Sequence, residues 1–260
     1  MARGVSTVLD VAVCLLLIGA AVATLTASVP DASENPTPNA DRTVALLTTN
    51  TDTVRLDRHE RRIHGTPAGH LAAAAVTSAT LDGDPLVGST HADAVDSTVS
   101  PVLGDRADAT ATWEPYPGAV LSGRVETGEP PPPRSTVGAT TVTVDVGIDS
   151  IAGDDYETVA ASLADAIVSW LFPPERTRTA LNDERTAGDV AERYRTMAAT
   201  LDASIEPELA AGNTQAVNDQ LVNALASRFE SELKAQFDTP ESAAANVSTD
   251  VEVAVRRWEP

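Results

Sequence analysis

The sequence is poor in two side chains, cysteine and lysine. Its 260 residues include one cysteine, Cys14, and one lysine, Lys234. A single thiol excludes an intrachain disulfide and a site in which several thiolates hold a metal. Only 18 basic residues stand against 38 acidic ones, and the net charge is -20. Because nucleic acids and anionic lipid head groups are bound through clustered Lys and Arg, the composition argues against both as partners.

Aromatic residues are also scarce, at 3% of the chain. Few aromatics, a large acidic surplus, almost no lysine and abundant Ala, Thr, Asp and Val together predict an acidic protein adapted to molar salt, from a halophilic archaeon. At such ionic strength the Debye length falls to about 3 Å, so neighbouring carboxylates hardly repel one another. We therefore interpret the acidity as a means of staying solvated and not as a sign of a basic partner.

Sequence motifs for catalysis are missing. The chain has no G-x-S-x-G, no Walker loop, no G-x-G-x-x-G and no S-x-x-K beside a plausible pocket. The four histidines are His59, His64, His70 and His91. His59 and His64 are five residues apart, so on a helix they would point about 140° apart and not share a zinc-binding face. The sequence predicts no catalytic residue, cofactor or metal site, and an anchored hydrolase assembled from distant residues is the least favoured alternative.

Four aspartates lie close together near the middle of the chain: Asp145, Asp149, Asp154 and Asp155. A calcium loop of the D-x-[DN]-x-[DN]-G type does not occur among them. Chance clusters of carboxylates are expected in so acidic a chain. We therefore predict no calcium site here.

An apolar segment near the start of the chain predicts a membrane helix over residues 5–30. Val11 to Val29 is a run of 19 residues without a charge, about 28 Å long as a helix, which matches a hydrocarbon core of about 30 Å. Arg3 and the amino terminus precede the run, and acidic residues follow it. The positive-inside rule then places the N-terminus in the cytoplasm and the remaining chain outside the cell.

The residues ahead of this run, Arg3-Gly4-Val5-Ser6, resemble the cleavage site of archaeal type IV prepilins. More loosely, the whole layout is similar to small pilin-like haloarchaeal surface proteins of unknown function. The resemblance implies that a prepilin-type peptidase cuts between Gly4 and Val5, that residues 1–4 are a leader, and that other pilin-like subunits are partners besides the lipid bilayer. An uncleaved signal anchor is the alternative. Removal by ordinary signal peptidase is disfavoured because the apolar run is longer than a secretory h-region.

Three residues of the apolar region are candidates for contacts between subunits. Within a filament, Asp10 can pair with the amino terminus of a neighbouring subunit, which offsets the cost of burying a charge. The alternative is that Asp10 stays at the level of the lipid head groups. Gly19 and Ala23 form a small-xxx-small pair that permits close approach of a second helix.

Beyond a Pro-containing linker (31–41), residues 42–260 predict one exterior α+β domain with an antiparallel sheet of five or six strands packed by helices. We expect a β-hairpin over 43–56, helices over 67–81 and from 89 or 90 to about 102, and strands over 107–113, 119–127, 136–148 and 247–255. A helix should begin near 154 and end before Pro173-Pro174. Two further long helices, about 190–209 and 214–237, should form a C-terminal antiparallel helical hairpin.

Asn246-Val247-Ser248 is the one N-x-S/T sequon of the chain. Since the predicted topology places it outside the cell, glycosylation of Asn246 is one expectation, and burial at the start of a strand is the other. The whole sequence predicts a non-enzymatic, single-pass cell-surface protein, a pilin-like subunit or accessory component of a type IV pilus-type assembly system. The alternative is a membrane-tethered extracellular binding or adhesion domain outside any pilus.

Overall fold

The fold is described from a computed structural model of the chain, which covers residues 39–56, 61–88, 91–148, 151 and 153–259. The chain divides into two units between Thr37 and Pro38, and the described residues belong to the second. The predicted leader, the predicted membrane helix and most of the predicted linker lie outside the described residues. Within the ranges given above, no helix is long and apolar enough to cross a bilayer.

The described part begins with helix α2 (Ala40–Thr49), where the sequence predicts the first strand of a hairpin. Asn39 caps this helix, because its side chain accepts a hydrogen bond from a backbone N–H of the first turn. The buried positions are spaced by three and four residues, as on one face of a helix: Ala40, Thr43 and Leu47. The prediction is wrong because alternation over so few residues does not separate a period of 2 from one of 3.6.

The expected strand at 52–56 is present as β1 (Asp52–Leu56), but its partner is β2 (Arg61–Gly65). The two antiparallel strands form a small sheet of their own. Val54 stands opposite Ile63 and is fully buried. The hairpin therefore exists one element later in the chain than the sequence predicts.

Helices α3 (Pro67–Thr77) and α4 (His91–Leu103) confirm the next two predicted helices. The first of them ends four residues early, because Thr80–Leu81 (β3) joins the main sheet and also pairs with β4 (Asp84–Pro85). The second continues two residues past Pro101. A proline in the last turn removes a single backbone donor, so the helix tolerates it.

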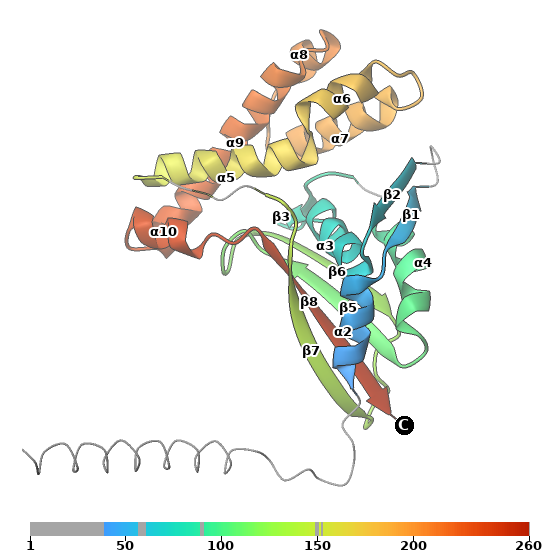
Figure 1. Ribbon diagram of the computed structural model, residues 1–260. Helices are drawn as coiled ribbons and strands as arrows, with labels where there is room; N and C mark the ends of the chain where they lie inside the picture. Colours follow the sequence, from blue (N-terminus) through green and yellow to red (C-terminus); the bar gives the residue numbers. More distant parts are fainter. Residues whose placement is uncertain (1–38, 57–60, 89–90, 149–150, 152, 260) are drawn as a thin grey trace, which may run out of the picture. The chain divides into compact units, whose positions relative to one another are not determined.

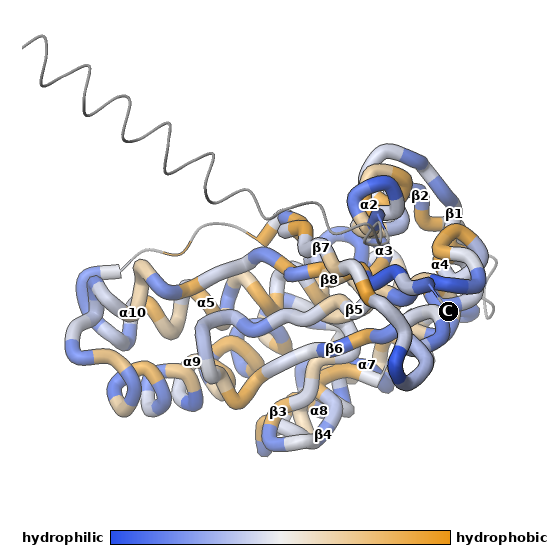
Figure 2. Tube along the Cα trace, turned by 90° about the horizontal axis from the view of Figure 1, so that it is seen from below, coloured by the Kyte–Doolittle hydropathy of each residue, from blue (hydrophilic) through white to orange (hydrophobic). Residues whose placement is uncertain are grey.

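The main sheet has six antiparallel strands in the order β4-β3-β6-β5-β8-β7, which confirms the predicted α+β class and sheet type. Its long strands are β5 (Ala107–Trp113), β6 (Leu121–Gly128), β7 (Thr136–Asp145) and β8 (Asp250–Glu259). Figure 2 shows these four side by side, with β7 outermost. The last strand of the chain thus lies between β5 and β7, pairing with both.

One face of this sheet is covered by α2, α3 and α4 (Figure 1). Alternate residues of the central strands are buried on that face: Ala109, Ala111, Val125, Val253 and Val255. The opposite face presents threonines and charged side chains, and most of those on the outer strands are exposed. Helix α3 approaches β6 most closely at Gly123, where a Cβ atom would overlap the carbonyl group of Ala75.

Between β7 and β8 the chain forms a helical layer of six helices within the described ranges. They are α5 (Tyr156–Leu171), α6 (Pro174–Leu181), α7 (Ala187–Thr200), α8 (Glu206–Ala210), α9 (Thr214–Gln236) and α10 (Pro240–Asn246). The helix predicted over 190–209 is divided into α7 and α8, since Leu201 to Ile205 leaves the helical conformation. Asp202 in this break has a positive φ of 52°, a backbone conformation that Asp tolerates better than most residues.

The predicted antiparallel hairpin of the last two long helices is wrong in its choice of partner. Helix α9 packs along α5, and two hydrogen bonds fix their antiparallel direction. Tyr156 at the start of α5 donates to the Phe237 carbonyl at 2.7 Å, and Asn218 near the start of α9 donates to the Phe172 carbonyl at 3.2 Å. α7 reaches this pair through Tyr194, which stacks on Phe172 with ring centroids 4.0 Å apart.

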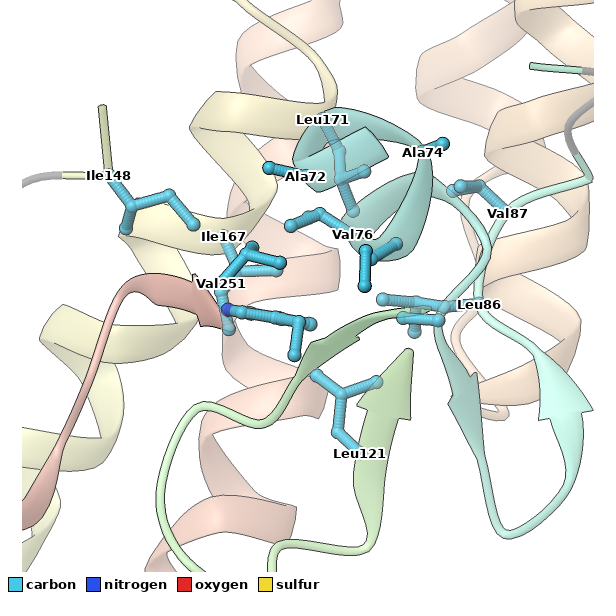
Figure 3. Packing of buried hydrophobic residues seen from close by; sticks show 14 of the residues in the cluster. Ala72, Ala74, Val76, Leu86, Val87, Leu121, Ile148, Ile167, Leu171 and Val251 are labelled. Carbon is cyan, nitrogen blue, oxygen red and sulfur yellow. The ribbon is translucent and has the colours of Figure 1, made fainter. Parts of the chain in front are cut away.

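The helical layer packs on α3 and on the end of the sheet. Figure 3 shows Ile167 and Leu171 of α5 beside Val76 of α3 and Val251 of β8. A polar contact joins the β5–β6 turn to α9. There the hydroxyl of Tyr116 donates to Glu232 Oε2 at 2.7 Å, and the same oxygen accepts the backbone N–H of Val120 at 3.3 Å.

We predict that Gly123→Ala lowers the free energy of unfolding by about 2 kcal/mol or more, because a methyl group there meets rigid backbone of α3. Gly188→Ala is the matched control. It adds a methyl group at an exposed helical position with nothing within 4 Å, so it should stabilise by about 0.5–1 kcal/mol. Denaturant unfolding of both variants measures the difference. Equal effects of the two substitutions would contradict the close approach.

Tyr116→Phe should lower the free energy of unfolding by about 1–2 kcal/mol, since it removes a hydrogen bond to a carboxylate. Burial, followed by the bond to Glu232 and the charge of that residue, raises the pKa of the Tyr116 phenol above its ordinary value. The stabilisation is therefore present below pH of about 10 and is lost as the pH rises further. Thermal unfolding between neutral and alkaline pH should show a shallower alkaline decline in the variant.

The control for this change is Tyr156→Phe, which removes a bond to a neutral carbonyl and should cost about 1 kcal/mol or less. If Tyr116→Phe has the same cost and the same pH dependence as this control, the bond to Glu232 does not hold the turn on α9.

Candidate functional site

The residues predicted for processing and assembly all precede the described part of the chain. Arg3, Gly4 and Val5, and likewise Asp10, Gly19 and Ala23, lie within residues 1–38, outside the described residues. Cleavage and subunit contacts therefore remain predictions from the sequence alone.

The sequon residue Asn246 is exposed at the C-terminal end of α10. Its side chain makes one local hydrogen bond, from Nδ2 to the Ser242 carbonyl at 2.9 Å. The neighbouring Ser248 is also exposed, and its backbone N–H donates to the Pro115 carbonyl at 2.9 Å. Asn246 therefore ends a helix on the surface and is not buried at the start of a strand.

The three described histidines are held by separate partners. His64 on β2 lies 2.9 Å from the hydroxyl of Thr53, and buried His70 on α3 lies 3.4 Å from the carbonyl of Asp52. His91 at the start of α4 lies 3.4 Å from the hydroxyl of Thr77. For His64 and His70 the partner is a hydroxyl or a carbonyl oxygen and not the carboxylate that orients a catalytic base. His59 lies outside the described residues.

The aspartates near residue 150 have local structural roles where they are described. Asp145 accepts the N–H of Gly147 at 2.7 Å just after β7. Asp155 caps α5 by accepting the N–H of Thr158 at 2.7 Å, and this bond, with a further one to the Thr158 side chain, lowers the pKa of the carboxyl. In the described part of the chain, no group of three or more His, Cys, Asp or Glu side chains is placed to hold a metal ion.

An open cavity of about 680 Å³ lies between α5 and the segment that connects β7 to it. The indole of Trp170 fixes this segment against the helix, since its Nε1 donates to the Val146 carbonyl at 2.8 Å. The wall contains apolar and polar side chains from both elements and from the start of α6: Ile148, Ile151, Ser162, Asp165, Ala166, Ser169, Trp170, Pro173 and Arg176.

The charged groups of this cavity are one carboxylate and one guanidinium. Asp165 and Arg176 are both exposed, and neither forms an ion pair with another described residue. Such a wall offers apolar contact together with hydrogen-bonding groups, which is the composition of a binding site.

Sequence reasoning did not identify this cavity. It used the apolar stripe of α5, whose members are buried in the core: Val159, Leu163, Ile167 and Leu171. The signal on the other face of the same helix is a row of small or acidic residues spaced by three and four, Ser162, Asp165 and Ser169. Such a row also occurs on an ordinary solvated helix face. It lines a cavity here only because the segment between β7 and α5 lies next to it.

We predict that Asn246 carries a glycan when the chain is exported by a host that glycosylates N-x-S/T sequons. The intact mass of the protein from membranes should exceed the polypeptide mass, and Asn246→Gln should remove the excess. Ser248→Thr preserves the sequon and is the matched control, which should keep the glycan. An unmodified mass for both the parent chain and the control would rule the modification out.

Comparison with known proteins places the chain in a family but gives no activity. No curated protein and no solved structure matches it at a significant level. A family model described as a family of unknown function (DUF7284) matches residues 9–258. Because this match covers nearly the whole chain, the protein belongs to that family.

Proposed function

We propose that the chain is a non-enzymatic, membrane-anchored protein of the cell surface, a pilin-like subunit or accessory component of a type IV pilus-type assembly system in a halophilic archaeon. One observation carries the proposal. A basic-Gly pair, Arg3-Gly4, stands six residues before the uncharged run from Val11 to Val29. A peptidase that cuts after such a pair leaves the apolar helix on the mature protein, where it serves both as anchor and as assembly surface.

The composition of the described domain is consistent with an anchor made by a separate segment. The buried apolar residues of the described part begin at Ala40 and end at Trp258. Most of them form one cluster built from both layers of helices and the sheet. A bilayer is the environment that the apolar run before Pro30 fits by its length.

The charges that flank the run support an exterior location for the domain. Arg3 precedes the run, whereas Asp31 and Glu34 follow it, the distribution that keeps the N-terminus inside. An acidic exterior surface also fits an environment of molar salt, where carboxylates hold water and repel each other little.

A membrane-tethered binding or adhesion domain is the second candidate, and the cavity beside α5 favours it. Its mixed wall with Asp165, Trp170 and Arg176 offers a ligand more specific contacts than a flat surface does. An anchored hydrolase is less favoured, because the described histidines contact hydroxyl and carbonyl groups and do not line this cavity.

The mature N-terminus distinguishes the first two candidates. Mass spectrometry of the protein isolated from membranes should find Val5 as the first residue, and Gly4→Val should block the cleavage. Ala2→Val, which leaves the basic-Gly pair unchanged, is the control and should be processed normally. A mature chain that begins at Met1 or Ala2 would exclude prepilin-type processing and favour the tethered binding domain.

A further inference from the structure

The two edges of the six-stranded sheet differ in what they offer to another chain. On one side, β4 contributes two residues, one of them Pro85. On the other, β7 runs for ten residues from Thr136 to Asp145 in unbroken register with β8, and Figure 1 shows the two strands next to each other. Among the described residues, no backbone group bonds to its outer side. This edge therefore presents a row of unpaired N–H and C=O groups.

Soluble proteins usually protect such an edge with proline, charged side chains, a bulge or a covering element. Residues 136–144 contain no proline and no charged residue, although 22% of the chain is charged. The pairing with β8 contains no bulge. α2 packs on this strand, where Asp41 accepts a hydrogen bond from Thr140 at 2.6 Å. Six of the ten strand residues nevertheless stay exposed: Thr136, Val137, Ala139, Thr141, Thr143 and Asp145.

Exposed apolar side chains also gather at this edge. In the described part, three large hydrophobic residues are exposed: Leu46 on α2 at 40%, Val120 at 40% and Val137 on β7 at 39%. Two of the three therefore belong to β7 or to the helix that packs on it. Val142 and Val144 are half-buried on the other face of the strand, opposite Val253 and Val251. Another strand at this edge would cover all of these valines.

We propose that β7 pairs in antiparallel orientation with β7 of a second copy of this chain, which makes one continuous sheet across a homodimer. Charge selects the partner. Below molar salt, where charges are only partly screened, two copies with a net charge of -20 each repel one another over most of their surfaces, so contact is cheapest along a strand segment that has no charged residue of its own. A basic partner, by contrast, finds one described carboxylate on residues 136–144, that of Asp41, which the Thr140 hydroxyl already holds.

The same argument fixes the register. Only with the two-fold axis at Thr140 does the uncharged stretch 136–144 pair entirely with itself. In that register Val137 stands opposite Thr143 of the partner subunit, twice in the dimer. Both side chains are exposed on the face of the sheet that the helices leave open, so they can be changed without disturbing the core.

A charge-swap series on the full chain in detergent tests the proposal. The dissociation constant is measured by light scattering and sedimentation in moderate salt, where charges are only partly screened. The unchanged chain should be a dimer.

Val137→Lys with Thr143→Lys places like charges opposite each other twice and should weaken the dimer about tenfold or more. Val137→Lys with Thr143→Glu places opposite charges there and should restore association to near that of the parent chain. Thr179→Lys with Ala210→Lys adds the same charge on exposed helix positions and should change little.

A monomeric parent chain would overturn the proposal. So would a dimer that the double lysine variant leaves intact, because contacts elsewhere, including those of the apolar N-terminal run, would then hold it together. If the double lysine variant dissociates but the charge swap does not restore the dimer, the register about Thr140 is wrong, and the proposed pairing falls with it. Circular dichroism of each variant confirms that the sheet is preserved.

Discussion

The fold depends on the pairing of the last strand, β8, between β5 and β7. Its valines Val251, Val253 and Val255 are fully buried against the helices, and its backbone supplies the partner of two strands at once. Until β8 is in place, β7 has no neighbour in the sheet. Contacts so distant in sequence cost loop-closure entropy, and the burial of apolar side chains must offset that cost.

The position of β8 also decides how the helical layer is held. Residues 146–249 leave the sheet and return to it at one register pair, Asp145 opposite Asp250. The helical layer is therefore an insertion between β7 and β8 whose two ends leave the sheet side by side. It needs further contacts to keep its orientation. Apolar packing of α5 beside α3 gives some of them (Figure 3), α7 contacts β4, and the bond from Tyr116 to Glu232 gives a directional one. The cavity beside α5 lies where this insertion begins.

These features connect the domain to its proposed place at the cell surface. The described histidines lie within hydrogen-bonding distance of hydroxyl and carbonyl groups, and Asp155 caps α5. Three surface features are candidates for function: a cavity lined by apolar and polar side chains, an exposed sequon at Asn246, and a sheet edge without charged residues over 136–144. Surfaces of this kind suit binding and assembly.

The sequence by itself determined the elements with a long, regular pattern. The valine alternation of β8 and the apolar stripes of α5 and α9 each specify one structure and one buried face, because side-chain direction follows the local backbone period. The tertiary structure decided the rest. It made 40–49 a helix, paired β1 with β2, and gave α9 the partner α5 in place of α7. A periodic pattern says which face of an element is buried but not which neighbour buries it. That choice rests on complementary shape and on polar groups such as Asn218 that meet only in the folded chain.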